Sequence, residues 1–224
     1  MPNIWPRRSF FLDYSPLMKL DGLIVLFSRS NMNSKKYIEI IWYGRGGQGA
    51  ITASQLIAEA AHLEGYKGIT TAPSFGAERR GAPVAAFLRL AHEPIRIFSQ
   101  VSDPDIIVVL DPSLLPVLKL KERYRPGATV IINSRHTPDE LGLDSFAVVG
   151  TADVTHVAIE NNLTMAGIAI LNTPILGAFV RVTNLVSLAG VEKAVEKKFS
   201  AEKARINMLA AKIIYDSTNI HQRG

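Results

Sequence analysis

The sequence predicts a three-layer α/β/α domain with a mostly parallel, mixed sheet, a Rossmann-like start and a helical C-terminal part. Two observations carry this prediction. Up to about residue 150, short runs of β-branched and apolar residues alternate with segments of helical periodicity, which is typical of βαβ units. In addition, Asp105–Leu110 (DIIVVL) is almost continuously apolar, as expected of a strand that is covered on both faces.

Strands are predicted where β-branched and aromatic residues cluster between glycine, proline or polar residues. The first is Tyr37–Tyr43, and a glycine turn joins it to a helix over Gly47–Glu64 that ends at Gly65. Pro83–Leu90 and Ile95–Phe98 are joined by Ala-His-Glu-Pro, so we interpret them as a hairpin that makes the sheet mixed. Further strands are expected over Tyr66–Thr71, Asp105–Leu110, Ala128–Asn133 and Phe146–Val149.

Helices are predicted to dominate after residue 150, each from a capping residue or from apolar side chains at helical spacing. Thr151 is expected to cap a helix over Ala152–Glu160. A second helix is expected over Ala166–Phe179, interrupted by Pro174. The last two are predicted from their caps, Asn184 before Leu185–Lys197 and Ser200 before a helix whose apolar face holds Ile206, Leu209, Ile213 and Ile214.

Residues 1–34 differ from the rest of the chain because they contain three Pro and show no sustained strand or helix period. We expect an N-terminal extension outside the core, which is irregular or results from a mis-assigned start with Met32 as the true initiator. A targeting or docking arm is the other interpretation. The folded domain is expected over residues 35–224.

The absence of Cys from all 224 residues limits the chemistry of the chain. It excludes disulfides, thiolate nucleophiles and Cys-ligated zinc or iron–sulfur sites, and it fits a cytoplasmic protein. The net charge of +5 is not concentrated in a Lys/Arg block, so nucleic-acid binding is not expected. The apolar run Gly22–Phe27 is too short for a membrane span, so we expect a soluble chain without membrane contact.

Nothing in the sequence predicts a catalytic residue or a metal site in this chain. The five His have no metal-ligand spacing, and we expect all of them at surface or helix positions. No nucleophile elbow or catalytic triad is recognisable. The chain is therefore predicted to lack self-contained catalytic machinery.

A glycine-rich turn directly after the first predicted strand is the sharpest local motif. Its residues match G-x-G-x-x-G at the head of a helix: Gly44, Arg45, Gly46, Gly47, Gln48 and Gly49. A dinucleotide site needs an acidic residue about 20 residues later, but Thr70 and Thr71 occupy that region. A P-loop is disfavoured because Ala50 and Ile51 stand where Lys and Ser/Thr are required. The turn is predicted either to approach an anionic group or to allow close packing, and both interpretations stay open.

The segment between Pro73 and Pro83 contains the second motif. Glycines frame a short charged cluster, which consists of Glu78, Arg79, Arg80 and Gly81. One interpretation is a solvated charged loop. The other is a shaped loop that directs an Arg towards a phosphate, a carboxylate or a partner chain.

Two further polar positions follow apolar segments. Asp111 comes at the carboxyl end of a predicted strand, which is the sheet edge where ligands bind, although a helix cap is its simpler role. Asn172 and Thr173 precede Pro174, and we expect them to satisfy backbone groups at a break in the chain.

Four segments, in order and spacing, resemble the gamma subunit of pyruvate (2-oxoacid):ferredoxin/flavodoxin oxidoreductases: GRGGQGAITASQLIAEAA, PSFGAERRGAPVAAFLRL, PIRIFSQVSDPDIIVVLD and NTPILGAFVRVT. The similarity runs from about Tyr37 to at least Leu188, and the combination of GRGGQG with GAERRGAPV makes it specific. It implies a subunit of an enzyme that oxidatively decarboxylates a 2-oxoacid, preferably pyruvate, to acyl-CoA and CO₂ and reduces ferredoxin or flavodoxin.

The resemblance also implies how the chemistry is shared. The complex is expected to use thiamine diphosphate, Mg, iron–sulfur clusters and coenzyme A, and to contain alpha, beta and delta subunits as partners. This chain is expected to bind none of these groups alone and to be inactive in isolation. Residues 44–49 and 78–81 are expected to lie at one sheet edge and to contact the catalytic subunits or coenzyme A, with Arg79 or Arg80 pairing with a carboxylate or a phosphate.

Other functions are compatible with the same residues. The chain could be the gamma subunit of a branched-chain 2-oxoacid or 2-oxoglutarate enzyme, because substrate choice is expected to lie with other subunits. It could also be a stand-alone nucleotide-binding α/β module, or a scaffold without ligand contact.

Overall fold

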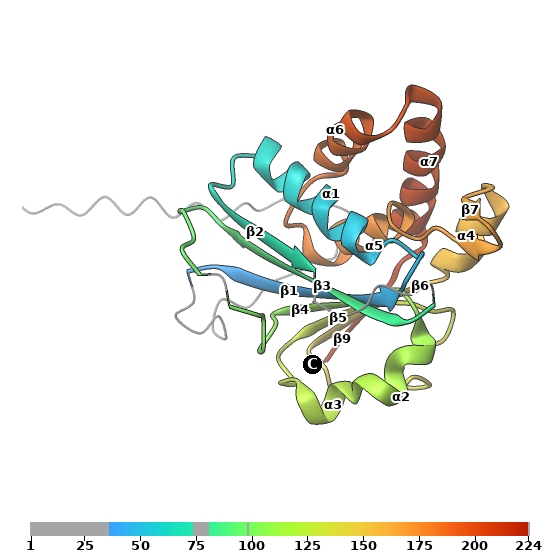
Figure 1. The fold of residues 1–224 in the computed structure, drawn as a ribbon. Helices are drawn as coiled ribbons and strands as arrows, with labels where there is room; N and C mark the ends of the chain where they lie inside the picture. Colours follow the sequence, from blue (N-terminus) through green and yellow to red (C-terminus); the bar gives the residue numbers. More distant parts are fainter. Residues whose placement is uncertain (1–35, 74–80, 98, 224) are drawn as a thin grey trace, which may run out of the picture. The chain divides into compact units, whose positions relative to one another are not determined.

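The computed structural model describes residues 36–73, 81–97 and 99–223, which form a seven-stranded sheet with helices on both faces (Figure 1). The strand order is β2-β3-β1-β4-β5-β6-β9. The strands are β1 (Ile38–Arg45), β2 (Gly68–Pro73), β3 (Pro83–Ala91), β4 (Ile106–Val109), β5 (Thr129–Asn133), β6 (Val148–Ala152) and β9 (Asn219–Gln222). The predicted extension over residues 1–34 lies outside the described residues.

The sheet is mostly parallel and mixed, which confirms the predicted fold class. Strands β1, β4, β5 and β6 are parallel neighbours. Strand β3 is antiparallel to both β1 and β2, and β9 is antiparallel to β6. The four parallel strands therefore place their carboxyl ends at one edge of the sheet, which we call the carboxyl edge.

The two faces of the sheet are covered by helical layers of unequal size (Figure 1). The larger layer contains α1 (Ala50–Leu63), α4 (Val154–Glu160), α5 (Pro174–Thr183), α6 (Leu188–Lys198) and α7 (Ala201–Ser217). The smaller layer contains the 3₁₀ turn η2 (Pro112–Leu114), α2 (Leu115–Leu118) and α3 (Leu120–Arg123). A separate small hairpin consists of β7 (Thr164–Met165) and β8 (Ile168–Ala169).

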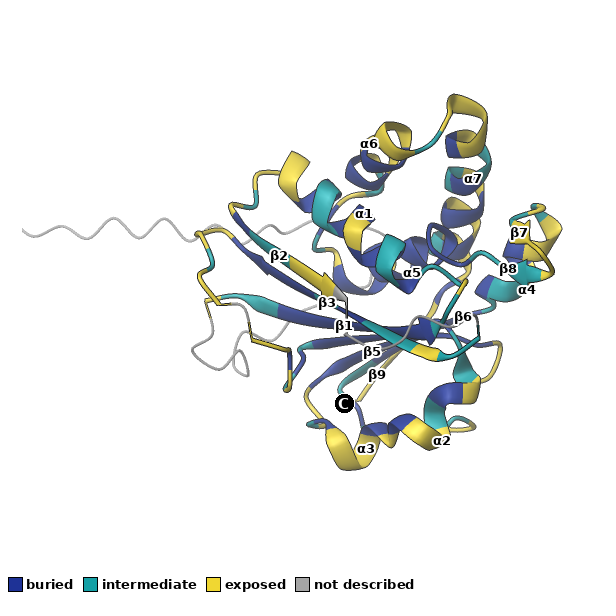
Figure 2. Ribbon diagram, in the orientation of Figure 1, coloured by how far each residue is buried: buried dark blue, intermediate teal, exposed yellow. Residues whose placement is uncertain are grey.

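Alternating side chains of β1 divide the core between the two faces, as the period of a strand requires. Ile40 and Trp42 face the larger helical layer, where the Trp42 ring stacks on Phe179 with 5.2 Å between centroids. Ile41 and Tyr43 face the smaller layer. Strands β4 and β5 are buried throughout, and β1 is buried except at its two ends (Figure 2). This agrees with the prediction from continuously apolar strand sequences.

The predicted hairpin of Pro83–Leu90 with Ile95–Phe98 is wrong. Strand β3 instead pairs with β1 and β2, and residues 95–97 form no strand. The chain after β3 crosses close to Gly68, because a Cβ built there would lie 2.1 Å from the Glu93 carbonyl oxygen. The mixed character of the sheet was predicted, and β3 was predicted as an antiparallel strand, but its strand partner was predicted wrongly.

The predicted helix starts after β6 also need correction. Thr151 and Ala152 belong to β6, and Asp153 caps α4 by accepting a 3.1 Å hydrogen bond from the His156 backbone N–H. The predicted helix over Ala166–Phe179 is wrong in its first half. Ala166 has a φ of +48° in the turn of the β7–β8 hairpin, and Pro174 begins α5 because proline fits the first helical turn.

Asn184 ends a helix, although the sequence indicated that it begins one. It adopts the left-handed conformation at the C-cap of α5 with a φ of +50°. Ser187 caps α6 instead, by accepting a 2.9 Å hydrogen bond from the Gly190 N–H. Ser200 does precede α7 as predicted, and β9 was not predicted.

Among the described helices, none combines the length and hydrophobicity that a membrane span requires.

Candidate functional site

The carboxyl edge contains a topological switch point between β1 and β4. After β1 the chain passes through α1 to β2, towards one end of the strand order. After β4 it passes through α2 and α3 to β5, towards the other end. Neighbouring parallel strands whose connections diverge in this way leave a crevice where ligands bind in α/β proteins. The glycine turn after β1 and Asp111 after β4 both lie at this point.

The glycine turn is closed by the side chain of Gln48. Its Oε1 accepts a 2.7 Å hydrogen bond from the Arg45 backbone N–H, while the Gln48 N–H donates to the Arg45 carbonyl oxygen at 3.0 Å. Gly47 and Gly49 have φ values of +98° and +91°, which side chains with a Cβ rarely adopt. The backbone of the turn therefore accounts for Gly49 and for the neighbouring Gly47, but not for the motif residues Gly44 and Gly46.

The same turn packs against the chain just before α5. A Cβ on Gly49 would lie 2.7 Å from the Asn172 Cβ, and the Leu171 N–H donates to the Gln48 carbonyl oxygen at 3.0 Å. Asn172 Oδ1 in turn accepts a 2.7 Å hydrogen bond from the Thr173 N–H, as the sequence predicted. Close packing, one of the two interpretations left open by the sequence, is thus a role of this turn.

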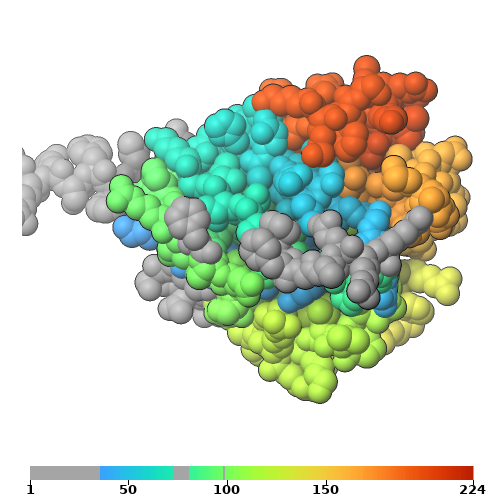
Figure 3. Space-filling model, in the orientation of Figure 1, coloured from blue at the N-terminus to red at the C-terminus, as the bar shows by residue number. Residues whose placement is uncertain are grey.

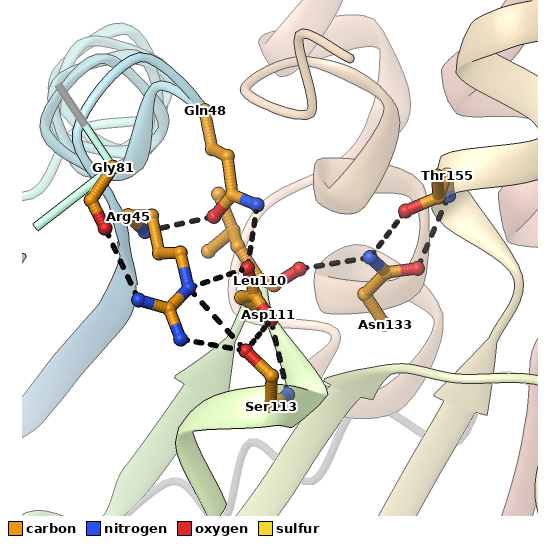
Figure 4. Close-up of polar contacts among 8 residues, drawn as sticks. All are labelled: Arg45, Gln48, Gly81, Leu110, Asp111, Ser113, Asn133 and Thr155. Carbon is orange, nitrogen blue, oxygen red and sulfur yellow. Dashed lines mark hydrogen bonds and ion pairs between the residues drawn. The ribbon is translucent and has the colours of Figure 1, made fainter. Parts of the chain in front are cut away.

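Arg45 joins the turn to its neighbours at the carboxyl edge (Figure 4). Its Nε lies 3.1 Å from Asp111 Oδ2, and its Nη2 donates to Ser113 Oγ at 2.8 Å. Its Nη1 donates to the Gly81 carbonyl oxygen at 3.1 Å. The backbone continues this link, because the Gly81 N–H donates to the Gly46 carbonyl oxygen at 3.0 Å. Arg45 therefore connects the first loop, the start of β3 and the end of β4.

Asp111 is the acceptor at the centre of this cluster. Its Oδ1 accepts from the Ser113 N–H at 3.0 Å and from Ser113 Oγ at 2.5 Å, and its Oδ2 accepts from Gln48 Nε2 at 2.9 Å. Burial raises the pKa of Asp111, but hydrogen bonds from Ser113 and Gln48 and the charge of Arg45 lower it by more. The pKa of Asp111 therefore lies below its ordinary value, and the side chain is a carboxylate at neutral pH.

These contacts make the cluster of Arg45, Gln48, Asp111 and Ser113 a brace, the name we use for it below. The Arg45 charge is compensated by a carboxylate whose side chain is only 16% exposed. Two of the four N–H groups on the Arg45 terminal nitrogens serve Ser113 and Gly81. The brace is thus better suited to fixing loops than to capturing an anion.

A second polar link extends the brace along the edge (Figure 4). Asn133, at the end of β5, donates from Nδ2 to the Leu110 carbonyl oxygen at 2.8 Å and to Thr155 Oγ1 at 2.7 Å. Its Oδ1 accepts from the Thr155 N–H at 3.1 Å. Asn133 was not predicted as a site residue, although it stands at the end of an apolar strand, as Asp111 does.

The strand order argues against a nicotinamide or flavin site at the glycine turn. In dinucleotide-binding folds the strand after the first helix lies directly beside the first strand and supplies the acid for the ribose. Here β3 stands between β1 and β2, and Thr70 and Thr71 lie in β2. Both the residue and its position are therefore unsuitable.

The predicted second loop is only partly described. Glu78, Arg79 and Arg80 lie outside the described residues, whereas Gly81 is held by Arg45 as above. Strand β2 ends at Pro73 and β3 starts at Pro83, and both points are at the carboxyl edge because β2 runs parallel to β1. The loop between them therefore leaves and rejoins the sheet at the edge that carries the brace.

The His residues are surface positions, as predicted. All five are exposed: His62, His92, His136, His156 and His221. Within the described ranges, no group of three or more His, Asp or Glu side chains is placed to hold a metal ion.

Comparisons with known proteins agree with this fold and these motifs. Residues 39–217 match the family model described as pyruvate ferredoxin/flavodoxin oxidoreductase. The chain is 42% identical over 189 residues to "pyruvate/ketoisovalerate oxidoreductases common subunit gamma" of Thermococcus litoralis, which covers 83% of this chain and 99% of that relative. It is 38% identical over 179 residues to "pyruvate synthase subunit PorC" of Methanocaldococcus jannaschii, with 80% and 96% covered.

A solved structure shows the same similarity in three dimensions. The crystal structure of pyruvate oxidoreductase subunit PORC from Thermotoga maritima superposes with a TM-score of 0.70 at 33% sequence identity. The match covers 84% of this chain and 100% of that chain.

Proposed function

The chain belongs to the pyruvate ferredoxin/flavodoxin oxidoreductase family and is a gamma subunit of such an enzyme, and from this premise we propose that its carboxyl edge docks on the catalytic subunits. The observation that carries this proposal is the brace, in which Arg45 of the first motif contacts Gly81 of the second motif and Asp111 at the same edge of the sheet. A surface that must fit another protein benefits from such fixed loops, because less conformational entropy is lost on binding.

The prosthetic groups are proposed to reside in the companion subunits. Without any Cys, this chain cannot ligate iron–sulfur clusters through thiolates. We propose that alpha and beta subunits hold thiamine diphosphate and Mg, that delta and beta subunits hold the clusters, and that ferredoxin or flavodoxin accepts the electrons. The gamma chain is proposed to pack against the catalytic subunits without holding a prosthetic group itself.

The choice of 2-oxoacid is proposed to lie outside this chain. The relative from Thermococcus litoralis is named as a subunit common to pyruvate and ketoisovalerate oxidoreductases, so one gamma chain is compatible with two substrates. We propose pyruvate as the substrate here because other relatives are named pyruvate synthase subunits. Exchanging the catalytic subunits while keeping this chain should change the preferred 2-oxoacid. A preference that follows the gamma chain instead would contradict the proposal.

The second loop is proposed to supply the free cations that the brace lacks. Arg79 and Arg80 would pair with a carboxylate of a catalytic subunit or with a phosphate of coenzyme A. The double substitution Arg79→Ala and Arg80→Ala in the assembled enzyme should weaken assembly or raise the KM for coenzyme A. Unchanged assembly together with an unchanged KM would contradict the proposal.

A matched control removes two positive charges elsewhere. Arg205 and Lys212 are exposed on α7 and belong to neither loop motif. Substituting both by Ala should leave assembly and the KM for coenzyme A unchanged. The contrast between the two double variants separates a local role of the loop from a general effect of net charge.

A further inference from the structure

Strand β2 forms one outer edge of the sheet and has little protection against pairing. Among the described residues its only strand partner is β3. Sheet edges are usually guarded by charged side chains, bulges or proline. Between Gly68 and Ala72 the sequence GITTA has no charged residue, and the residues that could protect the edge, Lys67 and Pro73, stand at its two ends.

A hollow between β2 and α1 adjoins this edge. Its volume is about 340 Å³, and it is lined by Gln55, Ala58, Glu59, His62, Ile69 and Thr71. Figure 3 shows the turquoise residues of α1 and β2 on the visible face of the molecule. An exposed strand edge beside a helix-lined hollow is the arrangement used for adding a strand from another chain.

We propose that the β2 edge pairs with β2 of a second copy of this chain and joins two sheets across a two-fold axis. An antiparallel pair of identical strands is self-complementary, as a two-fold contact requires. Thr70 and Thr71 suit such a contact because they are β-branched and uncharged, and Thr71 is already exposed. The proposal is independent of the docking role of the carboxyl edge.

The register of this pairing follows from which face each side chain occupies. Ile69 and Thr71 line the hollow, so they point to the α1 face, and Thr70 points to the other face. An axis perpendicular to the sheet keeps both α1 helices on one face, so opposite residues must point to the same face. This is met when Thr70 lies opposite the partner's Thr70 and Ile69 lies opposite the partner's Thr71.

Proline supports the same register. Pro73 has no N–H and cannot donate to a new strand. Centring the pair on Thr70 confines it to residues 68–72 and leaves Pro73 outside. Centring it on Thr71 would place Pro73 opposite the partner's Ile69.

The helices above the joined strands fit this arrangement. Because α1 contacts β1, β3 and β2, it is centred over β3, and two α1 helices would be separated by three strand spacings, roughly 14 Å. This exceeds direct helix packing, so long polar side chains must fill the gap. Each copy offers Glu59 and, bound to it at 2.6 Å, Lys197. Identical surfaces that carry both charge signs complement each other.

The natural absence of Cys gives a direct test in the full-length chain. In the proposed dimer, the two Cα atoms of residue 70 lie about 4.5–5.5 Å apart, which is within disulfide range. Thr70→Cys should therefore form a disulfide-linked dimer under mild oxidation. Thr71→Cys should cross-link at least about tenfold more slowly. In this register the two copies of residue 71 are diagonal neighbours rather than directly opposite, so their Cα atoms lie at the limit of the distance that a disulfide can span.

Two further comparisons separate pairing from damage to the fold. Asn219→Cys on β9 places a thiol on the opposite sheet edge and should cross-link as slowly as Thr71→Cys. By sedimentation velocity, Thr70→Lys and Thr70→Glu should each abolish the dimer of the wild type, and mixing them should restore it. The proposal is overturned by a monomeric wild type up to submillimolar concentration, by cross-linking without preference for residue 70, or by no recovery on mixing.

Discussion

Removing the charge of Asp111 tests the brace most sharply. Asp111→Asn keeps the size of the side chain but replaces one acceptor oxygen by an NH₂ group. The wild-type carboxylate accepts from Gln48 Nε2 at 2.9 Å and faces Arg45 Nε at 3.1 Å, besides two contacts with Ser113. The variant therefore loses the ion pair and leaves at least one donor without its acceptor.

The magnitude follows from burial. Hydrogen bonds to a charged group contribute about 1.5–3 kcal/mol when they are shielded. The Asp111 side chain is 16% exposed, but the Arg45 side chain is 35% exposed, so solvent screening reduces the share of the ion pair. We expect the free energy of unfolding to fall by about 2 kcal/mol, which corresponds to roughly 4–8 °C in Tm for a chain of this size.

The pH dependence gives this prediction its sign. Because the pKa of Asp111 lies below its ordinary value of about 3.9, its contribution is complete above that value and is lost as pH falls through the lower folded-state pKa. In urea unfolding, the difference between wild type and Asp111→Asn should be constant from about pH 7 to pH 5 and should shrink below about pH 4.

An exposed carboxylate provides the control. Asp144 lies 3.0 Å from Lys121, but its side chain is 57% exposed. Asp144→Asn should leave the urea midpoint nearly unchanged at pH 7. Equal effects of the two substitutions, or an Asp111→Asn effect that grows towards acid pH, would refute the reasoning.

Two further predictions concern the core. A Cβ on Gly177 in α5 would lie 1.9 Å from the Ala211 carbonyl oxygen in α7, so Gly177→Ala should destabilise the chain by about 3 kcal/mol or more. Gly127→Ala is the control, because nothing lies within 4 Å of a Cβ at that position, and it should leave the stability unchanged. Equal melting temperatures of the two variants would contradict this prediction. Arg89→Met removes one partner of the buried Glu39 carboxylate, the guanidinium group whose Nε lies 2.9 Å away, and should cost about 3 kcal/mol in urea unfolding. Replacing both residues by apolar ones should recover part of that loss, and a double variant worse than Arg89→Met would count against it.

The sequence was informative where local chemistry determines structure. The apolar runs of β1, β4 and β5 are buried strands, because side chains that are apolar on both faces require cover on both faces. The glycine turn is also local, since the positive φ of Gly47 and Gly49 is a property of the turn itself. Its position after the first strand was therefore predictable.

Contacts between distant segments could not be predicted from the sequence. Whether β3 pairs with β1 or with a later strand depends on competition within the whole sheet, so the local hairpin pattern was misleading. Asn184 suits a helix start and a left-handed helix end equally well, and packing of α5 decided between them. The contact of Asn133 with Thr155 joins residues from β5 and α4, and only the fold brings them together.

The most direct test of the central claim is a subunit-omission assay with coenzyme A-dependent reduction of a viologen dye by pyruvate. Our account predicts that the purified chain alone is colourless and inactive. It also predicts that the companion subunits without this chain have greatly reduced activity, and that adding the chain restores it. Turnover of pyruvate by the isolated chain, or full activity of the companion subunits in its absence, would contradict the account.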